Sequence, residues 1–264
     1  MNRPLRLALH GATGRMGRAL LDLLRDDGRF ELVAALTVPD APQLGEPVYL
    51  DRAAPRFTAQ WPSQALDVVI DFSGPTGLAH ALAQCRDRGI ALVSGTTGAD
   101  AALKACVAEA AQHIPLMHAS NFSLGVAVLA RLLRQAAAAL PAWDLEIVEA
   151  HHGRKVDAPS GTALLLGEAA AAARGTTLAR DGVSGTREGA RRAGSIGFAV
   201  VRGGDIVGEH TAMLIGSGER VELAHRATDR GIFARGALEA AHWLHDRPPG
   251  AYDLDAMLVA RLGA

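Results

Sequence analysis

Two histidines, an arginine and a lysine lie within five consecutive positions of this 264-residue chain. The segment reads His151-His152-Gly153-Arg154-Lys155. Imidazole and ammonium groups can donate protons, and neighbouring cations attract anions and lower the pKa of histidine and lysine. The segment therefore predicts a site that holds a small, multiply charged anion and protonates it. The competing interpretation is a solvated basic loop.

A predicted helix start follows this basic cluster and favours the anion site. Ser160 comes after Pro159 and is a residue type that caps helix N-termini. Gly161 and Thr162 would then offer backbone N–H groups and a hydroxyl at the helix N-terminus. The partial positive charge of such a terminus suits a carboxylate.

Two acidic residues flank the cluster, and each has two interpretations. Glu149 either orients a histidine or contacts a strand neighbour, and Asp157 either pairs with Lys155 or shapes the loop. Histidines without such neighbours are interpreted as structural or solvated side chains. They are His80, His113, His225, His242 and His245.

A second feature, near the start of the chain, is a set of glycines at regular spacing. Gly11, Gly14 and Gly17 follow the apolar run Leu5–His10 and precede a helical pattern. Glycines in this position allow a tight turn, and the helix N-terminus that follows can face a pyrophosphate. The pattern predicts a dinucleotide site, and the competing interpretation is a tight turn between a strand and a helix.

The choice between NADH and NADPH stays open. Dinucleotide folds usually carry an acid at the end of the second strand, where it binds the adenosine ribose. Here that strand ends Leu36-Thr37-Val38, and Asp40 comes only after a proline. Arg15 either meets a 2′-phosphate or is a solvated helix residue.

Polar residues follow two later apolar runs, at 71–74 and 94–98. Ligands bind outside the carboxyl ends of parallel strands, so both segments should border the same crevice. Gly95 allows close approach, and Thr96 and Thr97 offer hydroxyls, although Thr97 also suits a helix start. Further on, Asn121 either bonds a cofactor carboxamide or makes an Asx turn.

Strand and helix patterns alternate through about the first 120 residues, which is typical of a parallel sheet with helices on both faces. The expected strands are Leu5–His10, Phe30–Leu36, 68–72, 90–93 and 116–117. The expected helices are 18–27, Pro75–Arg88 and 99–113, with Gly28 and Gly89 ending the first two.

The pattern changes after residue 122. We expect helices at Leu124–Ala139 and 163–173, a loop at 175–195, a helix at 232–244, and strands at 145–150, Ile196–Arg202, 210–215 and Arg220–Ala227. Successive strands without helices indicate a mixed or antiparallel sheet. The chain is therefore predicted to be α/β, with a Rossmann-like parallel-sheet domain (1–121 with 231–264) and a second, mixed α/β domain (122–230).

Composition narrows the function classes. Lys and Arg number 27 and Asp and Glu 28, a net charge of −1, so no general attraction to nucleic acid is expected. Cys85 and Cys106 have no metal-ligand spacing and are expected to be reduced thiols, and no metal site is predicted. No signal segment or membrane span is apparent, which makes the cytoplasm the expected location.

Several of these segments together carry a resemblance. EAHHGRKVDAPSGTAL at 149–164 closely resembles the signature of the dihydrodipicolinate reductase family. The similarity extends to GATGRMGR at 11–18, DFS at 71–73, SGTTG at 94–98, ASNFS at 119–123 and GFAVVRGGDIVGEHTAM at 197–213. It covers essentially the whole chain, and the His-His and PSGT blocks are far more specific than the glycines.

The resemblance implies a reductase of diaminopimelate and lysine biosynthesis. Such enzymes reduce 4-hydroxy-tetrahydrodipicolinate, a small dianion, to tetrahydrodipicolinate with NADPH or NADH. Loss of water gives a conjugated imine, hydride moves to C4 of the substrate ring, and a proton goes to the adjacent carbon. A substrate-binding and oligomerisation domain, which forms homotetramers, accompanies the nucleotide domain.

The resemblance also implies roles for matching residues. His151 is the implied proton donor and Lys155 a second donor, whereas His152, Gly161 and Thr162 are implied contacts to substrate carboxylates. The implied cofactor contacts are Gly11, Ala12, Thr13, Gly14, Arg15, Met16, Gly95, Thr96, Thr97, Ser120, Asn121 and Phe122. The chain departs from the family where it has Thr37-Val38 in place of a common Glu-Arg pair, and Gly153 in place of a larger basic residue.

Two other functions compete with this one. A different nicotinamide-dependent dehydrogenase would leave the Ser160-Gly161-Thr162 helix start unexplained. A regulator that senses NAD(P) without turnover would need a DNA-binding or partner module, and the sequence shows no basic helix-turn-helix pattern.

Overall fold

The computed structural model describes residues 3–185 and 188–263. The chain divides into two compact units, one formed by Met1–Phe122 with Gly231–Ala264 and the other by Ser123–Arg230. Among the described residues, no helix has both the length and the apolar character needed to cross a membrane.

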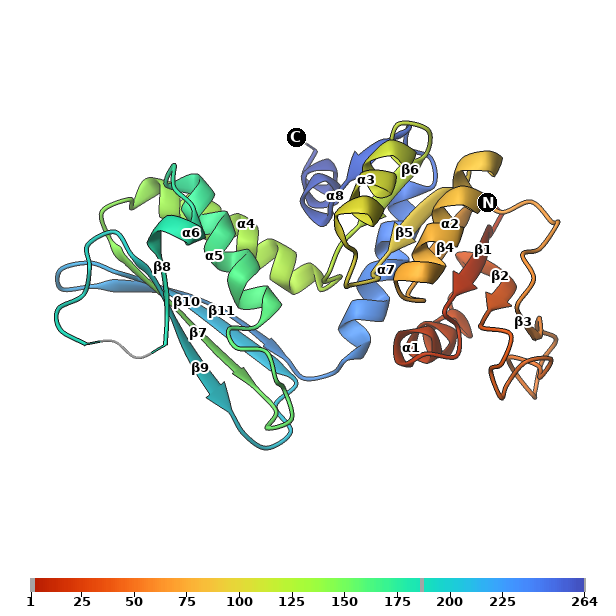
Figure 1. Ribbon diagram of the computed structural model, residues 1–264, viewed down its shortest axis with the longest axis horizontal. Coiled ribbons are helices and arrows are strands. Elements are labelled where there is room, and N and C mark those ends of the chain that lie inside the picture. The colour runs from red at the N-terminus through yellow and green to blue at the C-terminus, as the bar shows by residue number, and fades with distance from the viewer. Residues whose placement is uncertain (1–2, 186–187, 264) are drawn as a thin grey trace. The chain divides into compact units, whose positions relative to one another are not determined.

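The first unit is built on a parallel sheet (Figure 1). Buried apolar runs form its central strands, and the four residues of β4 are all buried, as expected for strands covered on both faces. In the described part of the chain the sheet has seven strands in the order β12-β6-β5-β4-β1-β2-β3. The strands are β1 (Leu5–His10), β2 (Phe30–Leu36), β3 (Phe57–Thr58), β4 (Val68–Asp71), β5 (Ala91–Ser94), β6 (Pro115–His118) and β12 (Gly250–Tyr252).

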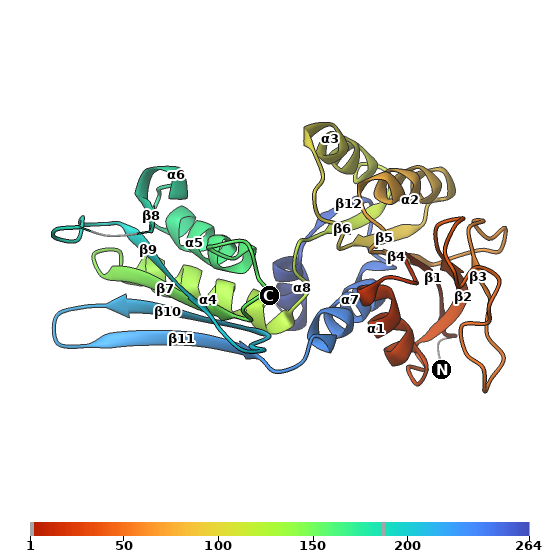
Figure 2. The ribbon, with the colours of Figure 1, turned by 60° about the horizontal axis from the view of Figure 1, so that its bottom comes forward.

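Helices cover both faces of this sheet, with α1 and α7 on one face and α2 and α3 on the other (Figure 2). Their bounds are α1 (Arg15–Leu24), α2 (Pro75–Arg88), α3 (Ala101–Ala110), α7 (Gly231–Leu244) and α8 (Leu254–Arg261). Gly89 ends α2 in the left-handed conformation, at φ 64°, as its position predicted. The predicted Rossmann-like fold is confirmed for this unit. The carboxyl ends of the neighbouring strands β1, β4 and β5 lie side by side.

The second unit is a mixed sheet with α4 (Leu124–Ala139) and α5 (Gly161–Ala173) on one face (Figure 1). Its described strands have the order β11-β10-β7-β9-β8. Their bounds are β7 (Asp144–His151), β8 (Gly182–Ser184), β9 (Ile196–Arg202), β10 (Gly208–Ile215) and β11 (Arg220–Ala227). β7 is parallel to β9 and antiparallel to β10, which confirms the predicted mixed sheet. Leu133, Leu145, Ile147, Leu166 and Leu214 are fully buried between sheet and helices.

The structure corrects several element predictions. The predicted loop at 175–195 contains a one-turn helix, α6 (Leu178–Asp181), and strand β8, while residues 186–187 lie outside the described part. The two-residue strand β3 and three-residue strand β12 were not predicted, since so few residues carry no periodicity. Helix α1 begins at Arg15 and ends at Leu24, earlier than predicted at both ends.

Candidate active site

The glycine loop after β1 is shaped by close backbone packing. Gly11 has φ 81°, and a Cβ there would lie 2.7 Å from the carbonyl oxygen of Phe72. A Cβ at Gly17 would lie 2.3 Å from the carbonyl oxygen of Gly11. Gly14 is the N-cap of α1 and is exposed. Gly14 has no side chain that could accept from the first-turn N–H groups of α1. These groups therefore stay available, as phosphate binding at a helix N-terminus requires.

A buried carboxylate organises the segments that follow β4 and β5. Asp71 accepts hydrogen bonds from His10 Nδ1 at 2.9 Å, Ser94 Oγ at 2.7 Å and Thr96 Oγ1 at 2.8 Å. It also accepts from the backbone and hydroxyl of Ser73. Burial alone would raise the pKa of Asp71, but the bonds from His10, Ser73 and Ser94 outweigh it and lower that pKa. Asp71 therefore holds the loop ends in place as an anion.

This network limits what some predicted cofactor residues can do with their side chains. Thr96 is 4% exposed, and its hydroxyl, while bonded to Asp71, also accepts the N–H of Gly74 at 3.1 Å. Phe122 is 1% exposed and meets Phe72 edge to face. A Cβ at Gly95 would overlap the Phe72 ring. Gly95 and Phe122 thus serve the packing around Phe72, and Thr96 serves the loop.

The end of β2 shows what replaces the usual ribose acid. Thr37 is nearly buried, and its hydroxyl lies 2.7 Å from the hydroxyl of Thr13 in the glycine loop. Val38, the next residue, is 59% exposed. The carbonyl oxygen of Thr13 accepts a bond from Arg18 Nε at 2.9 Å, and Arg15 is exposed at the start of α1. Two hydroxyls and the Arg18 side chain therefore lie at this corner.

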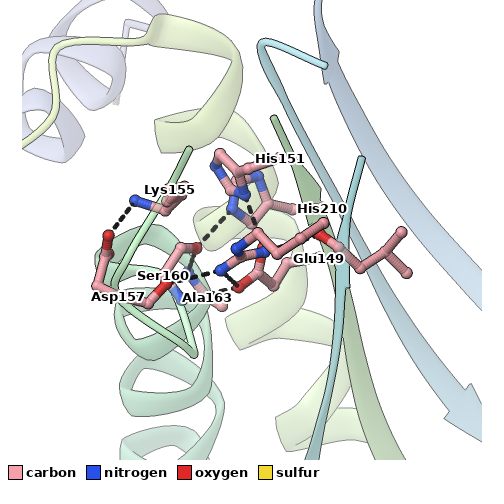
Figure 3. Close-up of polar contacts among 9 residues, drawn as sticks. Glu149, His151, Lys155, Asp157, Ser160, Ala163 and His210 are labelled. Carbon is pink, nitrogen blue, oxygen red and sulfur yellow. Dashed lines mark hydrogen bonds and ion pairs between the residues drawn. The ribbon is translucent and has the colours of Figure 1, made fainter. Parts of the chain in front are cut away.

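The other predicted chemistry lies in the second unit, on the face of the sheet that α4 and α5 cover. Burial alternates along β7, so Glu149 and His151 both point to the covered face. The neighbouring strands bring further polar groups into register, because His210 on β10 pairs with Glu149 and Arg202 on β9 pairs with His151. Three strands thus converge on one cluster beside the start of α5 (Figure 3).

Glu149 lies at the centre of that cluster and is fully buried. Its two oxygens accept from His151 Nδ1 at 2.6 Å, from both terminal nitrogens of Arg202 at 2.7 and 2.8 Å, and from the Ser160 backbone at 2.9 Å. Burial would raise the pKa of Glu149, but Arg202, His151 and Ser160 together lower it. The contact with His151 confirms that Glu149 orients a histidine.

His210 is a second buried histidine in the cluster. Its Nε2 lies 3.0 Å from Ser160 Oγ, and its ring meets that of His151 at a centroid separation of 5.2 Å. Burial, followed by the charge of His151, lowers the pKa of His210 to about 4. His210 is therefore a neutral side chain at physiological pH and supports the helix cap.

The start of α5 matches its prediction. Ser160 is the N-cap, and its Oγ accepts the N–H of Ala163 at 3.2 Å. Lys155 Nζ lies 2.7 Å from Asp157 Oδ1, which confirms the predicted pair. The bond from Lys155 is the main cause of a lowered pKa at Asp157, to which the backbone of Gly161 also contributes. Asp157 thus lies between the lysine and the helix N-terminus.

His152 is partly exposed beside this cluster. Its backbone N–H donates to the carbonyl oxygen of Ile206 at 2.8 Å, and its Nδ1 has no hydrogen-bond partner among the described residues. Desolvation and then the charges of Arg230 and Arg154 lower the pKa of His152. Because Nδ1 is buried, a ligand can reach this imidazole only through the rest of its partly exposed ring.

Among the predicted site residues of the second unit, the charges of His151 and Lys155 act on His152. Gly161 and Thr162 begin α5, and the N–H of its N-cap Ser160 donates to Glu149. Sequence reasoning assigned no role to Arg202 or His210. The signal that could have found them is strand register, since both lie on strands next to β7 and face the buried side. No group of His, Cys, Asp and Glu suited to a metal ion occurs among the described residues.

Comparison with known proteins shows the family to which the chain belongs. The family described as "Dihydrodipicolinate reductase, N-terminus" matches residues 5–122, and "Dihydrodipicolinate reductase, C-terminus" matches residues 125–258. A 4-hydroxy-tetrahydrodipicolinate reductase of Xanthomonas campestris pv. campestris is 50% identical over 251 residues, which cover 94% of this chain and 95% of the relative. The reductase of Nitrosomonas europaea is 43% identical and covers 98% of this chain and 99% of its own length.

A solved structure shares the fold. It is a dipicolinate-bound dihydrodipicolinate reductase from Paenisporosarcina sp. TG-14, with a TM-score of 0.76 and 22% identity. The match covers 95% of this chain and 97% of that chain, so both units have counterparts there.

Proposed function

Because this chain belongs to the dihydrodipicolinate reductase family, we propose that residues of its two units carry out the reduction of 4-hydroxy-tetrahydrodipicolinate to tetrahydrodipicolinate in the cytoplasm. The chain is an NAD(P)H-dependent oxidoreductase of diaminopimelate and lysine biosynthesis. The first unit binds the nucleotide, and the second binds the substrate.

The observation that carries this proposal is the cluster around Glu149. A histidine held by a buried carboxylate lies on the same face as a helix N-terminus and four residues before a lysine. Such a set can hold a carboxylate and deliver a proton to the same small molecule. A dehydrogenase acting on an uncharged alcohol would not need the helix N-terminus and basic residues that can hold an anion.

Each residue of this cluster has a distinct role in the proposal. Protonated His151 gives the proton on Nε2 to the carbon next to the reduced position and is left neutral with its remaining proton on Nδ1, and Lys155 is a second donor. His152 and the first-turn groups of Gly161 and Thr162 hold the two carboxylates of the substrate. Proton delivery by a positioned side chain contributes about 10²–10⁴-fold in rate.

The first unit fits a nicotinamide dinucleotide. Gly11 and Gly17 have no room for a Cβ, and Gly14 leaves the start of α1 open, which together form a phosphate-binding turn. Gly11 to Met16, Gly95 to Thr97 and Ser120 to Phe122 are the proposed contacts, those of Thr96 and Phe122 through the backbone. When bound, a reduced nicotinamide supplies the hydride.

Cofactor choice follows from the corner formed by Thr13, Thr37, Arg15 and Arg18. Its contacts include no carboxylate to bind a ribose hydroxyl or to repel a 2′-phosphate. The Arg18 guanidinium bonds to Thr13, and Arg15 is exposed at the start of α1. We therefore propose that the enzyme accepts both NADPH and NADH, with NADPH favoured. Arg15 is the residue proposed to meet the 2′-phosphate.

A homotetramer is also part of the proposal. Within the second unit, Val148 and Ala150 point away from the face that α4 and α5 cover, and Val201, which pairs with Ala150, is 47% exposed. An exposed apolar patch of this kind marks an interaction site, which copies of the chain would cover when they associate. Sedimentation of the wild type and of Val148→Glu would show whether this face carries the association.

A coupled assay tests the function directly. The substrate is generated in place by its synthase, and oxidation of NADPH or NADH is followed by absorbance. Oxidation that depends on both the synthase product and this enzyme is expected with each cofactor. Folded protein that oxidises neither cofactor would overturn the proposal, and oxidation with unrelated hydroxy acids or aldehydes alone would support a different dehydrogenase.

A further inference from the structure

We propose that Glu149 and Arg202 are positioning residues that fix neutral His151 in one tautomer, with its proton on Nδ1, so that Nε2 is the nitrogen that takes up the second proton of the imidazolium and gives it to the substrate. The inference rests on the proposed function only in treating His151 as the proton donor. The geometry around the carboxylate of Glu149 carries it.

The carboxylate of Glu149 is saturated by donors. An ionised carboxylate has about four acceptor sites. One oxygen takes His151 Nδ1 at 2.6 Å and Arg202 Nη1 at 2.7 Å, and the other takes Arg202 Nη2 at 2.8 Å and the Ser160 N–H at 2.9 Å. Guanidinium and backbone N–H groups can only donate, and an ionised carboxylate can only accept. In the contact between Glu149 and His151 Nδ1, Glu149 is therefore the acceptor. The proton of a neutral His151 must therefore be on Nδ1.

The second ring nitrogen of His151, Nε2, is left available for proton exchange. A Cβ built on Gly208 would lie 3.1 Å from Nε2, so only glycine at this position of β10 leaves that nitrogen uncrowded. The His151 side chain retains 11% of its exposure although Glu149 beneath it is fully buried. The imidazole is thus fixed from its Nδ1 side and approachable from its Nε2 side.

Arg202 connects the two parts of the site. A buried carboxylate without a cation would be costly, and a bidentate guanidinium satisfies both its charge and its geometry. The same Nη2 donates to the carbonyl oxygen of Asp157 at 2.7 Å. One side chain from β9 thereby holds Glu149 against His151 and also anchors the loop that presents Lys155. Lysine, with a single ammonium, could not make this set of planar contacts.

A purely structural ion pair would show the same contacts, so the test must read the tautomer. In Glu149→Gln the carboxylate becomes an amide of equal size. The glutamine oxygen accepts from Ser160 or Arg202, and its NH₂ group donates to Nδ1, which moves the proton of His151 to Nε2. In the Ser-His-Asp triad the equivalent exchange lowers kcat about 10⁴-fold through the wrong tautomer. In this site the NH₂ group also leaves the Nδ1–H of protonated His151, the donor form, without an acceptor.

The experiment is ¹⁵N NMR of imidazole-labelled enzyme without substrate, with His151→Gln assigning the signal. Neutral His151 is expected to carry its proton on Nδ1 in the wild type and on Nε2 in Glu149→Gln. In the coupled assay Glu149→Gln should lower kcat at least ~100-fold, with cofactor affinity unchanged. Arg202→Gln should lower kcat at least ~10-fold and shift the pH profile, with Arg202→Lys recovering only part of the loss. Gly208→Ala should lower kcat while the tautomer stays on Nδ1.

Arg220→Gln is the matched control, because Arg220 is 64% exposed and pairs with Glu222 on its own strand. Arg220→Gln should leave both the His151 tautomer and kcat unchanged. An Nε2–H tautomer in the wild type would overturn the proposal even if every variant failed to fold. So would a folded Glu149→Gln enzyme that keeps the Nδ1–H tautomer or full kcat. A wild-type enzyme that oxidises neither cofactor would overturn the proposed function. That outcome is separate from the tautomer of His151, which is measured without substrate.

Discussion

Lys155 donates a hydrogen bond from Nζ to Oδ1 of Asp157 across 2.7 Å, and the backbone of Gly161 also lowers the pKa of the same carboxyl group. Asp157 is more than half exposed. In the proposed function, the lysine and this helix start meet the substrate. A carboxylate of the chain itself therefore lies where a substrate carboxylate is expected to bind.

Replacing Asp157 with asparagine should tighten the binding of small dicarboxylates, because it removes a competing negative charge and keeps the side chain's shape. Exposed ion pairs are worth about 0.2–1 kcal/mol, so the gain should not exceed about fivefold in Kd. Calorimetric titration with dipicolinate, the molecule bound in the solved relative, measures it. Asp87→Asn, an exposed aspartate on α2 beside Arg86, is the control and should have no effect. Weaker binding by Asp157→Asn would show that Asp157 supports the ligand instead of competing with it.

Lys155→Ala should lower turnover by at least ~100-fold, because it removes a proton donor and a cation from the proposed substrate site. Cofactor affinity should not change, since the proposed nucleotide contacts lie in the other unit. The chain has only one other lysine, the exposed Lys104 on α3, which provides a matched Lys104→Ala control. Steady-state kinetics with the synthase-generated substrate, together with NADPH titration, separates the two effects. Wild-type turnover by Lys155→Ala would remove the lysine from the catalytic assignment.

Local sequence patterns were enough to predict the frame of the active site. The strand before His151, the N-cap at Ser160 and the helix after it each leave a signal within a few residues. The partners of Glu149 do not. Arg202 and His210 lie more than 50 residues away in the sequence and meet Glu149 only through the register of β9 and β10. A single sequence does not specify which strands pair, so these contacts could not be predicted.

The same reasoning explains the fold predictions. Buried central strands such as β4 are continuous apolar runs and were recognised, whereas β3, β8 and β12 have only two or three residues each. The need for glycine at position 95 also comes from tertiary packing. Phe72, on a different strand connection, occupies the space that a side chain at Gly95 would take.

Gly14→Asp should abolish or strongly weaken cofactor binding without unfolding the protein. Gly14 has an ordinary φ of −71° and is the N-cap of α1, a position that aspartate favours. Its carboxylate would take the N–H groups offered to the pyrophosphate and repel the phosphates. Gly14→Asn keeps the size and the capping and lacks the charge, so it should bind more tightly than Gly14→Asp. Fluorescence titration with NADPH compares them, and equal affinity for wild type and Gly14→Asp would place the phosphates elsewhere.

Thr37→Asp should shift cofactor preference toward NADH. Aspartate is close to threonine in size, can still accept the Thr13 hydroxyl, and adds the carboxylate that binds ribose and repels a 2′-phosphate. The ratio of kcat/KM for NADH to that for NADPH should rise at least ~10-fold, which corresponds to about 1.4 kcal/mol. Thr37→Val removes the hydroxyl without adding charge and controls for the lost Thr13 contact. An unchanged ratio would mean that the ribose does not reach the end of β2.

The free energy of unfolding should fall as the pH is lowered from about 6.5 toward 4, in part because of His210. Burial lowers the pKa of folded His210 to about 4, whereas an unfolded histidine titrates near 6.5. Between these values the unfolded chain binds more protons, so acid favours unfolding, and the stability linked to His210 is complete only above pH 6.5. A difference of this size corresponds to at most about 3 kcal/mol. His152 and His225 also have lowered pKa values, so the wild type alone would not isolate His210.

Comparison with His210→Gln isolates this contribution. Glutamine can still bond to Ser160 but does not titrate, and the effects of the other histidines cancel in the difference between the two proteins. Urea unfolding followed by circular dichroism at pH 7.5 and at pH 4.5 measures the stability advantage of the wild type over the variant. That advantage should shrink on acidification, by up to about 3 kcal/mol. If it stays constant between the two pH values, His210 titrates in the folded protein as it does in the unfolded chain, and its burial does not keep it neutral.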